Sequence, residues 1–262
     1  MTDAQCPICD GEREQVFSAL VLGRHDAEYL KCWWCGFLGP RSPQWLPEAY
    51  QSAIAEVDTG VLTRARTLEP RLTCILRLAF SKNAVFGDFG AGYGVLVRNM
   101  RDVGFDFRWS DPYCDNLLAR GFEFDGEVCA AVTAVEVLEH AQDPLAFLRK
   151  ALDLTRAAVI ILTTELLPEP VPDLDWWYYA FPTGQHIAFF ERRTLVAVAE
   201  RLGLHLRSRH NLHVLHSGRV KPWHFTVAAT RLAPPVAWAL RRSLRSRTDS
   251  DNPLLGNGPR AD

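Results

Sequence analysis

Short apolar runs alternate with amphipathic stretches over the middle of the chain. Runs with few polar residues predict strands buried on both faces, and apolar positions three and four residues apart predict helices. Strands that alternate with helices indicate an α/β fold, expected to be a Rossmann-like, mostly parallel sheet of about seven strands with helices on both faces. The expected strands are residues 84–89, 107–110, 128–137 and 157–163, and the expected helices are residues 95–103, 145–154 and 194–202.

The regions on either side of this alternation carry other patterns. Before it, apolar residues at mostly helical spacing predict helices over residues 44–58 and 60–80. After it, residues 204–215 and 224–232 are expected to be strands that flank a turn at Ser217-Gly218. A short helix and a frayed tail are expected to end the chain.

The composition is that of an ordinary globular protein, with 48% hydrophobic and 23% charged residues among 262. This length suits one domain, or one domain with a small appendage. No apolar run reaches the roughly 18 residues of a spanning helix, and the first residues do not resemble a secretory signal, so we expect a cytoplasmic protein without membrane contact. A net charge of −2 argues against nucleic acid as a partner and leaves the oligomeric state open.

Four of the seven cysteines lie near the start of the chain in two Cys-x-x-Cys turns. Two such turns can present four thiolates to one ion in a closed tetrahedral site, which suits structural zinc. Redox pairs or an iron–sulfur site are the alternatives, although the sequence lacks the strand-helix-strand context of a redox Cys-x-x-Cys. The predicted zinc ligands are Cys6, Cys9, Cys32 and Cys35, and Cys74, Cys114 and Cys129 are expected to be buried small hydrophobic residues.

A glycine-rich turn follows the first strand of the α/β region. Gly90, Gly92 and Gly94 alternate with other residues before the expected helix, so the backbone can turn tightly and approach a ligand closely. Neither the dinucleotide fingerprint nor a P-loop fits this spacing. Asp111 ends the next strand, where a carboxylate can bond the hydroxyls of a ribose. The alternative is a glycine-rich helix entry that binds no ligand.

Four sequence blocks in the right order resemble class I S-adenosylmethionine-dependent methyltransferases: GDFGAGYG, WSDP, VEVLEH followed by DPL, and GQHIAFF. The resemblance spans about residues 83–232. In that family the glycine turn cradles the amino-acid part of the cofactor and the acid after the second strand holds the ribose. The stretch between Asp111 and Val128 is shorter than is usual, and Phe124 and Asp125 are weak candidates for the adenine contact. The resemblance implies a cofactor site of Asp88, Gly90, Ala91, Gly92, Gly94, Asp111 and Glu136.

Two carboxylates and an imidazole follow the third strand, at the edge where open parallel sheets bind their ligands. These are Glu136, Glu139 and His140, and His186 lies in a loop expected to cover the same edge. The pattern resembles ubiquinone-pathway O-methyltransferases and small-RNA 2′-O-methyltransferases, whose matching residues hold a metal that chelates neighbouring hydroxyls. Three interpretations stay open: a divalent site for Mg or Mn formed by all four residues, a metal-free site in which His140, His186 and Glu139 act in catalysis, or a structural role.

Aromatic residues crowd the segment just before His186. Trp176-Trp177-Tyr178-Tyr179 and Phe181 lie in a predicted loop stiffened by prolines. Aromatic faces can stack on sugars or flat rings and can exclude water from a transfer site. Trp177, Tyr178 and Tyr179 are therefore expected to contact the acceptor, and a core cluster that only anchors the loop is the alternative.

The resemblance, together with these patterns, implies a methyltransferase that uses S-adenosylmethionine to methylate a hydroxyl of a small-molecule acceptor, such as a sugar. Methylation of nitrogen or carbon is one alternative, and a non-catalytic zinc-ribbon binding protein with a decayed methyltransferase domain is another. The expected division is a small N-terminal zinc ribbon over residues 1–42, a helical connector over 43–82, the cofactor-binding domain over 83–232, and a C-terminal helix with a flexible tail over 233–262.

Overall fold

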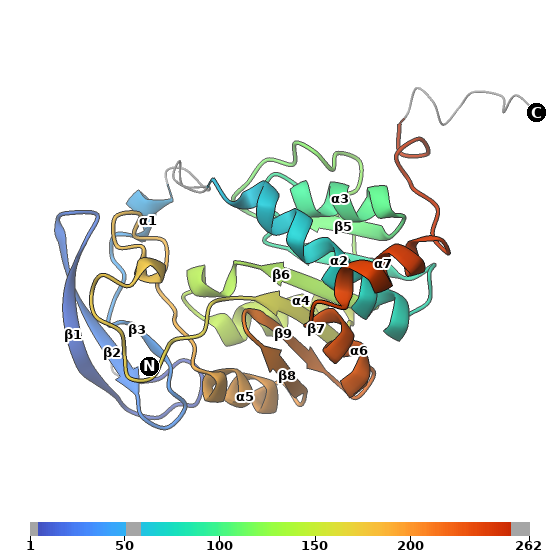
Figure 1. Cartoon of the computed structure of the whole chain (residues 1–262). Coiled ribbons are helices and arrows are strands. Elements are labelled where there is room, and N and C mark those ends of the chain that lie inside the picture. Colours follow the sequence, from blue (N-terminus) through green and yellow to red (C-terminus); the bar gives the residue numbers. More distant parts are fainter. Residues whose placement is uncertain (1–4, 51–58, 253–262) are drawn as a thin grey trace, which may run out of the picture.

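Two β-sheets organise the chain in the computed structural model, which describes residues 5–50 and 59–252 (Figure 1). The first is a three-stranded antiparallel sheet of β1 (Arg13–Val21), β2 (His25–Cys32) and β3 (Leu38–Pro40). The second sheet has six strands in the order β5-β4-β6-β7-β9-β8. They are β4 (Val85–Phe89), β5 (Asp106–Ser110), β6 (Ala131–Val135), β7 (Val159–Thr163), β8 (His205–Arg209) and β9 (Leu212–His216).

The six-stranded sheet is parallel over four strands and antiparallel at one edge. β5, β4, β6 and β7 run parallel, whereas β9 pairs antiparallel with both β7 and β8. The sheet confirms the predicted α/β class, with six strands in place of about seven. Because β4 has β5 on one side and β6 on the other, the connections reverse direction here, and the carboxyl ends of β4 and β6 form a switch point where such sheets bind ligands.

Helices cover both faces of this sheet, and alternate strand residues contact each layer. Ile161 of β7 belongs to the core under one layer, whereas its neighbours Ile160 and Leu162 belong to the core under the other. This two-sided burial explains why the parallel strands are nearly all apolar. The first layer holds α2 (Val61–Ala79), α3 (Val95–Val103), α6 (Pro222–Ala228) and α7 (Ala233–Arg241), and the second holds α4 (Pro144–Thr155) and α5 (Arg192–Arg201).

The late part of the chain corrects two sequence predictions. Residues 204–215 are not one strand but the hairpin of β8 and β9, which turns at His210, a residue with φ of +51°. Residues 224–232, predicted as a strand, begin within helix α6. Pro222 occupies its first turn and the His224 ring accepts the Lys221 amide, so local chemistry favours a helix start that the apolar pattern hid.

Other predictions hold in part. Helix α3 has the predicted bounds, and α7 is the predicted C-terminal helix. Of the helix expected over residues 44–58, the structure shows α1 (Leu46–Ala49), while residues 51–58 lie outside the described part, as do residues 253–262 of the expected tail. Cys74 and Cys129 are buried as predicted, but Cys114 is half-buried, because it lies in the loop after β5.

The small sheet is attached to the large one through the loop that precedes α5. The Leu38 and Phe189 backbones exchange two hydrogen bonds of 3.0 and 2.8 Å, and the Trp45 indole donates to the Gly184 carbonyl at 2.8 Å. Aromatic rings of both partners, including Tyr29 and Phe189, fill the space between them. The small sheet therefore forms one wall of the region around residues 184–189.

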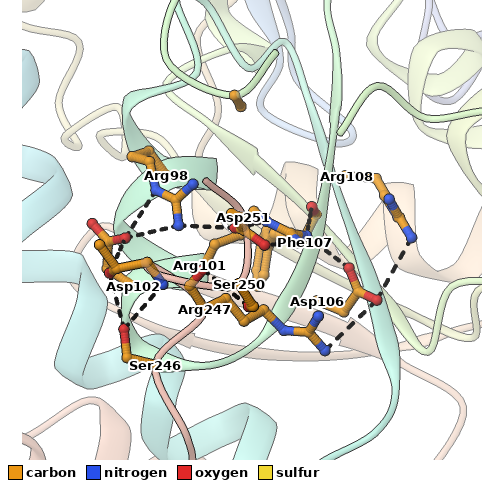
Figure 2. A network of polar contacts seen from close by, with 12 residues as sticks. Arg98, Arg101, Asp102, Asp106, Phe107, Arg108, Ser246, Arg247, Ser250 and Asp251 are labelled. Atoms are coloured by element: carbon orange, nitrogen blue, oxygen red, sulfur yellow. Dashed lines mark hydrogen bonds and ion pairs between the residues drawn. The ribbon is translucent and has the colours of Figure 1, made fainter. Parts of the chain in front are cut away.

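A buried arginine anchors the last described residues to helix α3 and edge strand β5 of the large sheet (Figure 2). Arg101 of α3 is 2% exposed and binds both carboxylate oxygens of Asp251 at 2.7 and 2.8 Å. Its remaining nitrogen contacts Asp106 at 2.7 Å, and Thr248 donates to Asp102 at 2.9 Å. A buried guanidinium needs such partners, so the segment up to Asp251 is part of the folded unit.

Candidate active site

The glycine-rich turn joins β4 to α3 at the switch point. Gly90 and Gly94 have φ values of +75° and +84°, which L side chains rarely adopt. A Cβ on Gly90 would lie 2.5 Å from Val137, so the turn packs directly against the segment after β6. The amides of Gly90 and Ala91 both donate to the Ser110 carbonyl, at 2.9 and 3.3 Å, which fixes the turn to the end of β5.

Asp111 connects this turn to the loop after β5. Its Oδ2 accepts the Gly92 amide at 2.9 Å, and its Oδ1 accepts the amides of Tyr113 and Cys114 at 2.8 and 3.0 Å. The structure thus brings together Gly92 and Asp111, two residues that the sequence placed in one cofactor site.

Asp88 lies at the end of β4, beneath the turn, and is 2% exposed. The Thr133 hydroxyl of β6 donates to its Oδ1 at 2.5 Å. Burial raises the pKa of Asp88 to about 7, and the negative charge of Asp111 adds to the rise, while the Thr133 hydrogen bond opposes it. Asp88 is therefore an internal group that ties β4 to β6 through Thr133.

Glu136 follows the last residue of β6 with a φ of +52°, an uncommon conformation for a residue with a side chain. Its amide donates to both the carbonyl and the hydroxyl oxygen of Thr163 on the neighbouring strand, at 3.2 and 3.1 Å. Such sparsely populated backbone conformations are held in place by their surroundings and gather at functional sites.

Three of the predicted polar residues form a tight cluster beyond β6. Donor atoms of Glu139, His140 and His186 lie within 4.8 Å of one another, and Glu136 does not join this group in the described part of the chain. The Glu139 carbonyl accepts the amides of Ile187 and Ala188 at 2.8 and 3.0 Å. These two bonds fix the loop that carries His186, so that the two imidazole rings lie 4.8 Å apart and nearly perpendicular.

Backbone carbonyls orient both imidazoles. His140 Nδ1 lies 3.1 Å from the Gln185 carbonyl oxygen, and His186 Nδ1 lies 2.7 Å from that of Tyr178. A carbonyl oxygen only accepts, so Nδ1 donates in both rings and the lone pair is on Nε2. This orientation is typical of histidines that ligate a metal or take up a proton.

The Glu139 carboxyl group is fully buried beside them. Its Oε1 accepts the Tyr178 hydroxyl at 2.8 Å, whereas its Oε2 has no hydrogen-bond partner among the residues that the structure describes. Burial raises the pKa of Glu139 well above its usual range, and the charge of Glu136 adds to this. A buried carboxylate oxygen of this kind needs either a proton or a cation.

The three aromatic residues predicted to contact the acceptor differ in their burial and in their neighbours. Trp177 is 72% exposed. Tyr178 is buried, and its hydroxyl lies 3.0 Å from both the Thr164 hydroxyl and the Glu165 amide as well as bonding Glu139. Tyr179 is buried away from this cluster among Phe17, Trp176, Phe181 and Phe189. Tyr178 alone of the three touches the Glu139 carboxyl group.

Tyr50 is a member of the site that sequence reasoning missed. Its ring lies 6.3 Å from that of His140 and 5.8 Å from that of Tyr113, which follows Asp111 by two residues. The ring thus spans the distance between the Asp111 loop and the histidine cluster. A tyrosine at the end of a proline-punctuated linker has no sequence signal that separates it from an ordinary core residue.

Comparison with known proteins identifies the family. A profile described as "Methyltransferase domain" matches residues 66–209, more than half of the chain. The chain belongs to this methyltransferase family. The prediction of a class I methyltransferase is thereby confirmed, and comparison with curated protein sequences finds no significant match.

Solved structures similar to this methyltransferase include TnmH, with 16% identity, a TM-score of 0.45, and coverage of 66% of this chain and 60% of that one. Human N-acetylserotonin methyltransferase, solved with S-adenosylmethionine, has 15% identity, a TM-score of 0.45, and coverage of 67% and 56%. An O-methyltransferase family 2 protein from Planctomyces limnophilus has 12% identity, a TM-score of 0.46, and coverage of 68% and 63%. The methyltransferase described here therefore spans about 60% of the length of the first of these proteins.

The methyltransferase also carries the four-cysteine cluster at the end of its small sheet. The four sulfur atoms lie within 4.8 Å of one another, and the Cys6–Cys35 and Cys9–Cys32 sulfur pairs are each 3.5 Å apart. The residue after each Cys-x-x-Cys, Asp10 or Gly36, has a positive φ and donates its amide to the first cysteine's carbonyl. Sulfurs bound to one zinc at about 2.3 Å in a tetrahedron lie about 3.8 Å apart, so the four thiols fit this ion.

A cavity of about 520 Å³ lies next to the segments that carry the two histidines. Gln142 and Ile187 line it on the side of the large sheet, and Arg13, Phe37 and Pro43 line it on the side of the small sheet and linker. Its volume is in the range of small-molecule sites. Neither the predicted acceptor contacts Trp177, Tyr178 and Tyr179 nor the cluster of Glu139, His140 and His186 lines it.

Proposed function

We propose that this methyltransferase transfers a methyl group from S-adenosylmethionine to a hydroxyl of a small molecule, such as a sugar or another hydroxylated metabolite. The observation that carries the proposal is the cluster of Glu139, His140 and His186 beyond β6, in which two imidazoles lie beside a buried carboxyl group. A hydroxyl must lose a proton when it is methylated, and two oriented imidazoles beside a buried carboxyl group supply proton acceptors.

S-adenosylmethionine would bind along the carboxyl ends of β4 and β5. The open backbone of Gly90, Ala91, Gly92 and Gly94 suits its amino-acid part, and Asp111 suits the ribose hydroxyls. In this proposal Asp88 supports the turn from within the sheet, and Glu136 approaches the amino-acid part from the end of β6. These residues surround the switch point of the sheet.

The sulfonium is already an activated donor, so positioning supplies much of the rate. The acceptor oxygen attacks the methyl carbon, the carbon–sulfur bond breaks, and S-adenosylhomocysteine leaves as a neutral thioether. The hydroxyl proton passes to Nε2 of His140 or His186, the two imidazoles that lie beside Glu139.

The same cluster fits a divalent cation, and this is the second form of the proposal. Glu139 Oε2 and the two Nε2 atoms would hold the ion, which suits Mn or Mg when completed by oxygens. A bound cation lowers the pKa of a hydroxyl that it contacts. In either form Tyr178 positions Glu139 through its hydroxyl rather than contacting the acceptor.

Two measurements test this function. Calorimetry with S-adenosylmethionine is expected to show one site, and mass spectrometry with a panel of nucleotide sugars and other hydroxylated metabolites is expected to show addition of one methyl group to oxygen. Failure to bind S-adenosylmethionine would contradict the proposal, as would a methyl group found on nitrogen or carbon. Loss of the transfer on chelation, restored by Mn, would select the metal form.

We further propose that the small sheet is a zinc-binding module with Cys6, Cys9, Cys32 and Cys35 as ligands. Four thiolates leave no open position, so the ion would be structural. The Cys35 carbonyl accepts the Thr194 hydroxyl of α5 at 2.7 Å, so this module would hold the small sheet against the catalytic domain. Reduced thiolates persist in a cytoplasmic environment, where we expect the protein to act.

A further inference from the structure

Tyr50 is held at the candidate site by the same loop that carries His186. Its amide donates to the Leu46 carbonyl, and the preceding carbonyl, of Ala49, accepts the Gln185 side chain at 2.9 Å. Trp45, at the other end of α1, donates to the Gly184 carbonyl. The backbone around Tyr50 is thus fixed to residues 184 and 185, the two residues that directly precede His186.

The Tyr50 ring lies between the two halves of the proposed reaction. It stacks with Tyr113 at 5.8 Å and 27°, and the Tyr113 amide donates to Asp111. It also lies 6.3 Å from the His140 ring, at an interplanar angle of 68°. Burial raises the pKa of Tyr50, so the phenol keeps its proton and the ring is uncharged.

The donor sulfur of a methyl transfer must lie between the ribose and the acceptor oxygen. With the ribose at Asp111 and the acceptor at the histidine cluster, this places the sulfonium in the space that Tyr50 borders. A sulfonium is a cation, and the face of an aromatic ring attracts a cation through its quadrupole. After transfer the sulfur is uncharged, and this attraction is lost.

We propose that the ring of Tyr50 binds the sulfonium of S-adenosylmethionine and so discriminates the methyl donor from its demethylated product. The proposal rests on the proposed function, because it requires S-adenosylmethionine at the switch point. It assigns the effect to the aromatic face and not to the hydroxyl. The linker from the small sheet thereby contributes a binding residue to the catalytic domain.

The test compares the affinities of S-adenosylmethionine and S-adenosylhomocysteine by calorimetry, in the full chain and in variants. Tyr50→Leu keeps an apolar side chain without a ring, and Tyr50→Phe keeps the ring without the hydroxyl. Tyr50→Leu is expected to lower the affinity for S-adenosylmethionine by about 3- to 30-fold and the affinity for S-adenosylhomocysteine by less than about twofold. Tyr50→Phe is expected to keep the wild-type ratio of the two dissociation constants. Trp238→Leu, at an exposed aromatic position on α7, serves as the matched control and is expected to change neither constant.

If Tyr50→Leu lowers the affinity for both ligands equally, or lowers neither, the proposal is overturned while the proposed function stays intact. If the wild-type chain binds neither ligand, both fail. If Tyr50→Leu does not fold, fluorinated phenylalanines at position 50 replace it. Each added fluorine reduces the quadrupole, so S-adenosylmethionine affinity should fall stepwise at constant S-adenosylhomocysteine affinity, and a flat series would overturn the proposal.

Discussion

The cysteine cluster and the cluster of Glu139, His140 and His186 are equally compact but are assembled from different parts of the fold. In each, the donor atoms lie within 4.8 Å of one another. The cysteine cluster takes all four of its thiols from two tight turns next to one small sheet, and four thiols are the number that a tetrahedral site requires. The cluster of Glu139, His140 and His186 is assembled from a turn and a distant loop, and it offers three donors. The first arrangement suits a closed structural ion, and the second leaves room for a substrate.

The largest expected effect follows from breaking the first cluster. Cys32→Ser combined with Cys35→Ser should abolish zinc binding and remove its folding contribution, which is of order 10 kcal/mol in structural zinc sites. Zinc content by mass spectrometry and thermal unfolding measure this. Cys114→Ser, outside the cluster, is the matched control and should keep the metal. One zinc per chain in the double variant would contradict the assignment.

Within the second cluster, substitution of His140 should change the rate rather than the folding. His140→Gln is expected to lower kcat by about 10²- to 10⁴-fold, because it removes an oriented proton acceptor or ligand, while the melting temperature and zinc content stay unchanged. His210→Gln changes an exposed histidine on the β8–β9 turn and should leave kcat at the wild-type value. Unchanged turnover in His140→Gln would show that the cluster is structural.

The second cluster should also make stability depend on pH, through Glu139. Its folded-state pKa is raised, so its contribution to stability is fully present below about pH 4.5 and is lost as the pH rises through the folded pKa. Glu139→Gln should remove this loss, because a glutamine does not titrate. Urea unfolding between pH 4 and pH 9 measures it. Asp88→Asn tests the separate loss of stability that is expected as the pH rises to about 7, the pKa of Asp88. Identical pH profiles of stability for Glu139→Gln and wild type would refute the Glu139 assignment.

The smallest expected effect is the difference between removing the hydroxyl of Tyr178 and removing that of its neighbour Tyr179. Tyr178→Phe removes the hydroxyl that bonds Glu139 and should cost about 1–2 kcal/mol of unfolding free energy and lower kcat several-fold. Tyr179→Phe removes a hydroxyl that bonds only the Pro172 carbonyl at 3.2 Å, among the described residues, and should leave kcat unchanged. Equal turnover in the two variants would mean that Tyr178 does not position Glu139.

Sequence patterns predicted the parts of this protein that depend on local chemistry. The α3 bounds follow from glycine turns at both ends of an amphipathic run, and the Cys-x-x-Cys turns specify their own geometry. The failures arise from tertiary context. The β8–β9 turn at His210-Asn211 carries only a weak turn signal, without glycine or proline, inside an otherwise strand-like run. Tyr178 and Tyr179 point to different environments because a 3₁₀ turn separates neighbouring side chains. Tyr50 reaches the site through contacts more than 60 residues distant in sequence, which no periodicity reports.

The buried ion pair between Arg101 and Asp251 determines where a folded fragment of this protein can end. The family match stops at residue 209, whereas the partner of the buried guanidinium lies 42 residues later, at 251. A fragment cut at the end of the match would lose α6 and α7, which cover α2, and would leave Arg101 with Asp106 as its carboxylate partner. The unit of sequence similarity is therefore shorter than the unit of folding, and expression of the domain should preserve the chain through Asp251.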